Sequence, residues 1–316
     1  MDDALYLEKA RVFRMIEAIP SMKKSRALQE KWIVLSFIGA AAIILLVITV
    51  YPFLFALYTS FHTWMLTKPE TGTPFVGLFQ YKNLLFSSVF QHSLGITLIF
   101  VFMSVGGTFL IGLCLALVLS REDIGGKSIF RTILIIPYFL TPVVVGFAFR
   151  FMYDAKVGLI PYFLSLVGIH LDTILGNPSI ALYAVIAVDI WNQTPLAFLI
   201  LLAGFQAIPL ELYEVAKVDG ASSWQTFRYI TLPLLKYAIS LVLLIRTIEA
   251  FKMFDVLYVM TEGGPGRSTE LLNMLGYKLA FSFFRMGGAS AFSILVFCIV
   301  MGISYFYIKF IMTAER

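Results

Sequence analysis

Residues 94–119 read LGITLIFVFMSVGGTFLIGLCLALVL, an apolar run without a charged residue. An α-helix rises about 1.5 Å per residue, so this run is long enough to cross the roughly 30 Å hydrocarbon core of a bilayer. Lipid offers no partner to backbone N–H and C=O groups, so a segment that crosses it folds as a helix. The stretch therefore predicts a membrane-spanning helix.

The composition of the whole chain is that of a protein solvated by lipid. Of its 316 residues, 59% are hydrophobic and 14% are charged, and the mean hydropathy is +0.88. Soluble proteins carry about 25% charged residues. Five further apolar runs occupy residues 32–58, 132–149, 180–205, 237–258 and 289–311. We predict an all-α, polytopic membrane protein with six transmembrane helices, kinked at Pro52, Pro142 and Pro195.

Lysine and arginine are distributed unevenly over the segments between these runs. Fifteen lie in the segments 1–31, 120–131, 206–236 and 309–316, against seven in 59–93, 150–179 and 262–286. Because cytoplasmic loops are the more basic ones, both termini are predicted to be cytoplasmic. The same asymmetry accounts for the net charge of +5 without a nucleic-acid partner.

This topology divides the chain into an N-terminal tail (1–31), a transmembrane domain (32–311) and a C-terminal tail (312–316). In the N-terminal tail, apolar residues between Val12 and Met22 lie among lysines and arginines, a pattern typical of an amphipathic helix on the inner membrane surface. A plain cytoplasmic tail held by its positive charge fits the same pattern.

No group of residues in the sequence predicts catalysis or cofactor binding. The stretch Ile124–Ser128 ends like a phosphate-binding loop, but that loop needs a glycine where Arg121 stands. Cys114 and Cys298 lie in separate apolar runs and predict buried small side chains rather than a disulfide or a metal site. We expect no catalytic residue, no metal ligand and no cofactor bound by this chain.

The loop 208–233 carries the strongest local signals. Pro209 suits the first position of a helix, and Glu211 and Glu214 lie near the positive end of its dipole. Asp219-Gly220 then predicts a turn in which the glycine takes a positive φ.

A second helix is predicted to follow this turn. Ser222 and Gln225 have the spacing of a capping box, and the helix runs from there toward Pro233. The loop is therefore expected to form a helix–turn–helix that projects from the bilayer and docks in a groove of another protein. A plain amphipathic loop shows the same pattern.

The spacing Glu214-x-Ala216-x₃-Gly220-x₉-Ile230-x-Leu232-Pro233 resembles the Glu-Ala-Ala loop of ABC-importer permeases, with a departure at Val215, where that family prefers alanine. The resemblance implies the fold of a type I ABC-importer permease, whose loop is seated in a cleft of an ATPase subunit. The residues that it assigns to this coupling are Glu214, Ala216, Asp219, Gly220, Ile230, Leu232 and Pro233.

Three more motifs extend the resemblance over most of the chain. They are Val76-Gly77-Leu78-x₂-Tyr81, Phe130-Arg131-Thr132 with Pro137, and Thr261-x-Gly263-Gly264-Pro265. All three look like those of carbohydrate-importer permeases, and the last is similar to the first permease subunit of the maltose and glycerol-phosphate type.

The resemblance implies a transport subunit of the bacterial cytoplasmic (inner) membrane, not an enzyme. Its implied partners are a second, homologous permease, two ATP-binding cassette subunits, an extracytoplasmic solute-binding protein and a carbohydrate. ATP and Mg would be used by the partner ATPase.

Two of the predicted transmembrane helices carry polar side chains, which at membrane depth usually face a cavity or a partner. By the same resemblance, the sugar-facing positions fall at helix-face spacing in both. The predicted substrate path consists of Asp189, Asn192, Gln193, Leu196, Arg246, Glu249, Ala250 and Met253. Arg246, Glu249, Lys252 and Asp255 alternate in sign, so neighbours can pair along one helix.

Our hypothesis is that Arg246 contacts an anionic substrate, such as an alginate-type, uronate-containing oligosaccharide or a phosphorylated polyol. The alternative is that the charges pair within the helix bundle and fix its packing. Another class of function is an ion-coupled secondary transporter with Asp189, Glu249 and Asp255 as relays, which leaves the loop 208–233 unexplained. A structural membrane scaffold is a third class.

Overall fold

The structure, a computed structural model, describes residues 36, 38–120, 126–171 and 173–313. The tail 1–31 lies outside the described residues, as do residues 314–316 of the predicted C-terminal tail. The chain divides into two units, Met1–Tyr58 and Thr59–Arg316, which are considered separately.

The described part of the first unit belongs to one apolar helix, Ile38–Ser60. It holds a π-helical turn, η1 (Leu46–Val50), directly before α2 (Tyr51–Ser60). Pro52 follows within α2 and has no N–H to give to the ladder, and the Tyr51 N–H reaches back five residues to the Leu46 carbonyl. The irregularity predicted at Pro52 is thus present as a widened turn.

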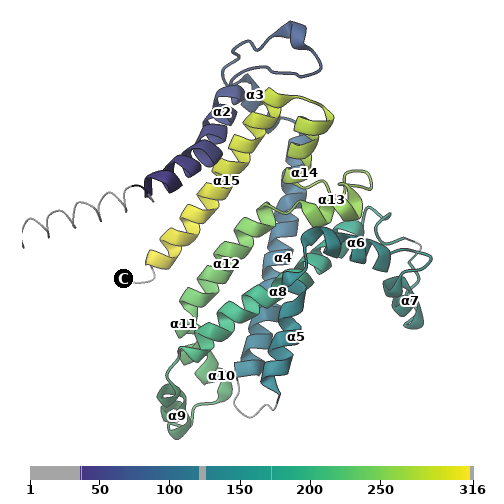
Figure 1. Cartoon of the computed structure of the whole chain (residues 1–316). Coiled ribbons are helices and arrows are strands. Elements are labelled where there is room, and N and C mark those ends of the chain that lie inside the picture. Colours follow the sequence, from purple (N-terminus) through teal and green to yellow (C-terminus); the bar gives the residue numbers. More distant parts are fainter. Residues whose placement is uncertain (1–35, 37, 121–125, 172, 314–316) are drawn as a thin grey trace, which may run out of the picture. The chain divides into compact units, whose positions relative to one another are not determined.

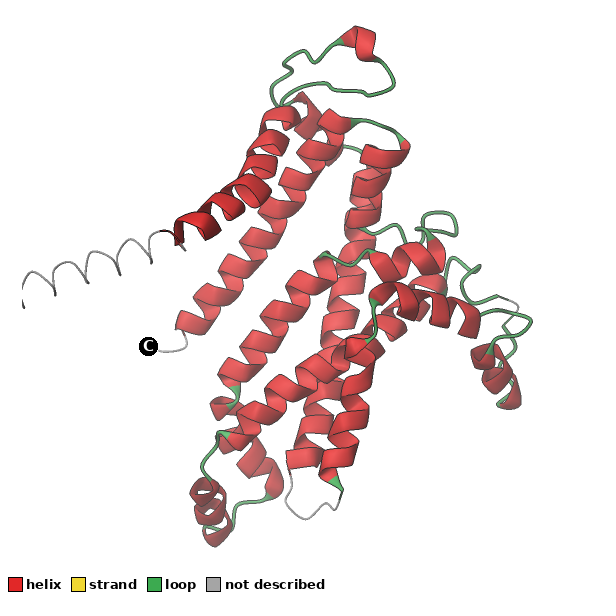
Figure 2. Ribbon diagram, in the orientation of Figure 1, coloured by secondary structure: helices red, strands yellow, loops and turns green. Residues whose placement is uncertain are grey.

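The second unit consists of helices and loops, and the described residues include two isolated β-bridges but no strand (Figure 2). Its elements are η2 (Pro69–Thr71), α3 (Phe79–Leu85), α4 (Ser88–Ser120), α5 (Lys127–Phe139), α6 (Pro142–Met152), α7 (Leu159–Leu166), α8 (Ala181–Gln206), α9 (Leu210–Val218), α10 (Ser223–Thr226), η3 (Phe227–Thr231), α11 (Leu232–Leu234), α12 (Lys236–Phe251), α13 (Asp255–Thr261), α14 (Leu272–Tyr277), η4 (Lys278–Ser282) and α15 (Met286–Thr313).

Four helices of the described residues are long and apolar enough to cross a membrane: Ile38–Ser60, Ser88–Ser120, Ala181–Gln206 and Met286–Lys309. Two bent pairs, Lys127–Phe139 with Pro142–Met152 and Ser223–Leu234 with Lys236–Phe251, raise this number to six if each pair is one span. The predicted six transmembrane helices are therefore the upper end of the range that the structure allows.

Two of the predicted spans differ from the observed helices. The run 132–149 was expected to be one helix kinked at Pro142, but α5 and α6 meet at 95°. Proline disfavours a helical residue before it, and Thr141 is extended, with φ −64° and ψ 140°. The run 237–258 ends as a helix at Phe251, and α13 begins at Asp255. The break leaves the charges of Lys252 and Asp255 exposed.

The long helices α4, α8 and α12 pack against one another and form the centre of the second unit (Figure 1). α5 lies against α8, and α15 lies against α12 and α3. A methyl group on Gly112 of α4 would lie 3.0 Å from the Ala197 Cβ of α8, and one on Gly204 of α8 would lie 2.8 Å from the Ala238 Cβ of α12. These glycines let the helix backbones approach closely, as in other membrane helix bundles.

Candidate functional site

A charged cluster lies buried where α4, α8 and α12 meet. Arg246 of α12 donates from Nη2 to the Asp189 Oδ2 of α8 at 2.6 Å and to the Ser104 Oγ of α4 at 3.1 Å. Ser104 in turn donates to the same Asp189 oxygen. Arg246 is 1% exposed and Asp189 is 5% exposed. The cluster therefore ties three helices together through one ion pair.

Because this pair is buried, the Arg246 side chain faces another charged side chain of the bundle. A single charge moved from water into a protein interior costs several kcal/mol, and a well-placed opposite charge offsets much of that cost. The structure thus has the pairing within the bundle that we considered as the alternative for Arg246. The partner comes from another helix, however, not from the same one. Along α12, Glu249 pairs with Lys252 at 3.4 Å.

The predicted substrate-path residues do not form one open face of the second unit. Asp189, Asn192, Arg246 and Ala250 are buried, whereas Glu249 is exposed. Gln193, Leu196 and Met253 are partly exposed. These residues have helix-face spacing along α8 and α12, but α4 packs against both helices and helps to bury part of each face.

Asn192 has a structural partner at the break between α5 and α6. Its Nδ2 donates to the Pro137 carbonyl at 2.7 Å, and the Gln193 Nε2 donates to the Asn192 Oδ1 at 3.0 Å. The Pro137 carbonyl also accepts from the Leu140 N–H at 3.3 Å, so the Asn192 side chain adds a second hydrogen bond to a carbonyl in the last turn of α5. The polar face of α8 thus supports the end of α5.

The loop 208–233 forms the helix–turn–helix that its sequence predicts. Pro209 is the residue before α9 rather than its first residue, and Gly220 has φ 75°. The capping box is complete: the Ser222 N–H donates to the Gln225 Oε1 at 2.7 Å, and the Gln225 N–H donates to the Ser222 Oγ at 3.3 Å. The second helix, however, is short and passes through the π-helical η3 before it bends by 65° into α12.

Few contacts hold this loop to the rest of the second unit. Ile208 and Phe227 pack against residues of α4, α8 and α12. Within the loop itself, Ala216 is buried and the Tyr213 and Thr231 hydroxyls lie 3.2 Å apart. A cavity of about 1160 Å³ separates much of the loop from the ends of α4 and α5.

The outer surface of the loop is rich in exposed apolar side chains. Val218 is 87% exposed, Tyr229 is 74% exposed and Trp224 is 69% exposed. Among the predicted coupling residues, Glu214, Asp219, Gly220 and Pro233 are exposed, and Ile230 and Leu232 are partly exposed. Exposed apolar patches of this kind mark sites that contact another protein or a membrane. Ala216 is the exception, because its methyl group packs inward.

Comparison with known proteins identifies the family of this chain. The family model described as the inner membrane component of binding-protein-dependent transport systems matches residues 109–312. This match contains α8, the loop 208–233 and α12, and it extends over more than half of the chain. The chain belongs to this family.

Among relatives of this permease, the trehalose/maltose transport system permease protein MalF of Thermococcus litoralis is 38% identical over 269 residues, which are 84% of this chain and 89% of the relative. The trehalose transport system permease protein SugA of Mycobacterium tuberculosis is 34% identical over 94% of both chains. The resemblance to maltose-type permeases, stated from the sequence motifs, is confirmed by these relatives.

The permease also matches solved structures. A bacterial ABC transporter involved in the import of the acidic polysaccharide alginate contains a chain that superposes with a TM-score of 0.78 at 22% identity, over 92% of this permease and 98% of that chain. At this identity the match concerns the fold alone. The fold of a type I ABC-importer permease, predicted from the loop, is confirmed.

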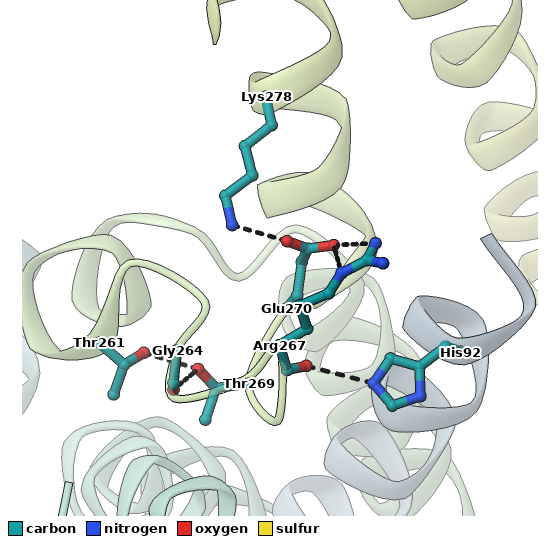
Figure 3. A network of polar contacts seen from close by, with 7 residues as sticks. All are labelled: His92, Thr261, Gly264, Arg267, Thr269, Glu270 and Lys278. Carbon is teal, nitrogen blue, oxygen red and sulfur yellow. Dashed lines mark hydrogen bonds and ion pairs between the residues drawn. The ribbon is translucent and has the colours of Figure 1, made fainter. Parts of the chain in front are cut away.

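The third motif of the permease, at Thr261 to Pro265, begins a loop with its own polar network (Figure 3). Thr269 Oγ1 donates to the Gly264 carbonyl at 2.7 Å and lies 2.7 Å from the Thr261 hydroxyl. Glu270, 3% exposed, accepts hydrogen bonds from Arg267 and Lys278. Burial alone would raise the pKa of the Glu270 carboxyl, but these two cations outweigh burial and lower the pKa below its ordinary value.

Two polar residues, one in the buried cluster and one in the third motif's network, were missed from the sequence. Ser104 lies in the apolar run 94–119 and hydrogen-bonds both members of the buried ion pair. Glu270 forms ion pairs with Arg267, in the loop after the third motif, and with Lys278, the first residue of η4. A serine within an apolar helix and a glutamate between basic residues were the available signals, but neither identifies its partner.

Proposed function

We propose that this permease imports a sugar across the bacterial inner membrane as one of two related membrane subunits. Two partner ATPases would drive it, and a solute-binding protein would deliver the sugar from outside. The trehalose and maltose permeases among its relatives support this proposal. A solved alginate ABC transporter with a similar chain is in complex with a periplasmic protein, which supports this set of partners.

The loop 208–233 is the observation that carries the coupling. It presents Val218, Trp224 and Tyr229 to the outside on two short helices, and the turn at Gly220 fixes the angle between these helices. A groove in an ATPase subunit would cover these apolar side chains. ATP binding in that subunit would then move the loop, and α12, which directly follows it, would transmit the movement to the centre of the bundle. This arrangement requires the loop and both termini to be cytoplasmic, as the lysine and arginine distribution predicts.

For the substrate, we propose a neutral sugar. The charge of Arg246 is offset by Asp189 inside the chain, so it is not available as a lone cation for a uronate or a phosphate. Glu249 is the exposed charge of the predicted path, and a carboxylate disfavours an anionic substrate through like-charge repulsion. An acidic sugar, our earlier hypothesis, would need the ion pair to open first.

Uptake into proteoliposomes tests this function. The permease is reconstituted with its co-purifying subunits and solute-binding protein, and labelled trehalose is offered with ATP inside and without any ion gradient. We expect uptake that depends on ATP, and a Gly220→Leu variant should lose it because its backbone cannot take φ 75° without strain. Uptake driven by a proton or sodium gradient without ATP would instead support the ion-coupled transporter.

The control for Gly220→Leu is Val157→Leu, a substitution at an exposed apolar position outside the loop. It should leave ATP-dependent uptake unchanged. Competition by an excess of glucuronate-containing oligosaccharide but not by unlabelled maltose would contradict the neutral-sugar proposal while leaving the ATP requirement intact.

A further inference from the structure

The second unit has another cavity, of about 670 Å³. Figure 1 shows two of the elements that bound it, α3 and the start of α15, at the end of this unit opposite α9. The cavity is bounded by α3, the start of α4, the residues after the third motif, η4 and the start of α15. None of the predicted substrate-path or coupling residues lines it. It is therefore separate from the site described above.

The lining of this cavity has an excess of positive charge. Glu270 is its carboxylate, and it binds Arg267 at 2.7 Å and Lys278 at 2.6 Å, as Figure 3 shows. Arg285 also lines the cavity and has no ion-pair partner among the described residues. Three cations against one carboxylate leave an excess of two positive charges. The cavity is thus suited to an anionic group.

Gln80 of α3 gives a second, independent indication of a ligand. It is 7% exposed and lines the same cavity. Its side-chain amide, which offers two donors and an acceptor, makes no hydrogen bond with the described residues, and its atoms are not among the fully buried unpaired ones, so they are open to the cavity. Buried polar side chains in folded proteins are normally paired. A polar ligand in the cavity would supply the missing partner.

The surroundings of the cavity indicate the kind of ligand. Phe283 lines it and is 57% exposed, and Phe79 and Phe86, on and directly after α3, are 55% and 76% exposed. Exposed phenyl rings beside cations match a membrane surface, where acyl chains cover the rings and headgroup phosphates face the cations.

We propose that this cavity binds the phosphate headgroup of an anionic phospholipid. Arg285, with Arg267 and Lys278 beside it, neutralises the phosphate, and the Gln80 amide donates to a headgroup oxygen. The exposed phenylalanines contact the first part of the acyl chains. The site anchors α3, α14 and the start of α15 to one leaflet at the end of the permease away from the coupling loop.

Lipid retention measured by native mass spectrometry tests this proposal on the permease with its co-purifying subunits. The probes are phosphatidylglycerol, phosphatidylcholine and free glycerol 3-phosphate. The variants are Arg285→Gln, which removes the cation without an ion-pair partner, and Gln80→Glu, which keeps the size of the side chain but repels a phosphate. Lys82→Gln is the matched control, because Lys82 lies on α3 but does not line the cavity.

We expect phosphatidylglycerol to be retained in preference to phosphatidylcholine, and Arg285→Gln to weaken retention about tenfold or more, as for one lost charge-assisted hydrogen bond. Gln80→Glu should weaken it further, and Lys82→Gln should not. Unchanged unfolding midpoints in phosphatidylcholine show that the variants are folded.

Three results would overturn the proposal. The first is equal retention of the two lipids, or an equal effect of Lys82→Gln and Arg285→Gln. The second is displacement of the lipid by glycerol 3-phosphate at a similar concentration, which would make the site one for a free phosphate. The third is displacement by the purified solute-binding protein, which would assign the cavity to a protein partner.

Discussion

Removal of one partner from the Asp189–Arg246 pair should destabilise the permease far more than removal of both. The nearest atoms of the two charges are 2.6 Å apart, and their attraction is about 4–6 kcal/mol at an effective dielectric constant of about 20. Arg246→Gln leaves the Asp189 carboxylate buried without its cation, and Asp189→Asn leaves the guanidinium in the same position. Loss of one partner from a buried pair typically costs about 3–5 kcal/mol.

The double variant Asp189→Asn/Arg246→Gln removes both charges and keeps groups that can bond to each other and to Ser104. Replacement of a whole buried ion pair is often close to neutral. The double variant should therefore regain most of the lost stability, so the coupling energy in the double-mutant cycle should be close to the sum of the two single effects.

The assay is reversible unfolding of the purified permease in mixed micelles, followed by tryptophan fluorescence and compared with folded yield. Lys252→Gln is the matched control: its ion pair with Glu249 is exposed, and such pairs contribute about 1 kcal/mol or less. Simple addition of the two single effects at positions 189 and 246 would refute the reasoning. Full stability of Arg246→Gln with a selective loss of acidic-sugar uptake would refute it too, because Arg246 would then face the substrate.

Three further predictions concern the loop, the helix packing and the outer polar network. Ser222→Ala removes the capping hydroxyl of α10, so it should destabilise the loop locally by about 0.5–2 kcal/mol, seen as faster amide exchange in residues 223–231 while the rest of the chain is unaffected. Gly112→Leu should separate α4 from α8, since even a methyl group there would lie 3.0 Å from the Ala197 Cβ, and the folded yield should fall sharply. The pKa of Glu270 is lower in the folded chain than in the unfolded chain, where it is about 4.3. The ionised carboxylate therefore stabilises the folded chain above pH 4.3, and this stabilisation is lost as the pH falls through the lowered pKa of the folded chain. The difference in unfolding midpoint between the wild type and Glu270→Gln should therefore shrink on acidification.

Each of these predictions has its own control. Ser222→Thr keeps a hydroxyl at the cap and should restore slow exchange, and fast exchange in both variants would show that the cap is unimportant. Gly302→Leu changes a glycine of α15 that has open space around it, so an equal loss of yield there would speak against close packing at Gly112. For Glu270, an unfolding-midpoint difference that grows on acidification would contradict the sign of the pKa shift.

The amino-acid sequence predicted those features that depend on neighbours along the chain. The positive φ of Gly220 and the capping box of Ser222 and Gln225 involve backbone groups a few residues apart, so local chemistry is enough to predict them. The sharp break before Pro142 was predicted only as a kink. Proline removes the N–H and disfavours a helical residue before it, but the surrounding helices decide how far the chain then turns.

The sequence by itself thus determined that the chain is a helical membrane protein with a helix–turn–helix at 208–233, because apolar runs in lipid can fold only as helices and the loop's turns are local. Only the tertiary structure decided which partner each buried charged side chain has. Asp189 and Arg246 are 57 residues apart, and Ser104 is 142 residues from Arg246, so helix periodicity could place each on a face but could not choose its partner. The same holds for Gln80 and Arg285, which line one cavity only because α3 packs against α15. In an interior of low dielectric constant, a buried charge interacts most strongly with the charge nearest to it in space, whatever their separation in the sequence.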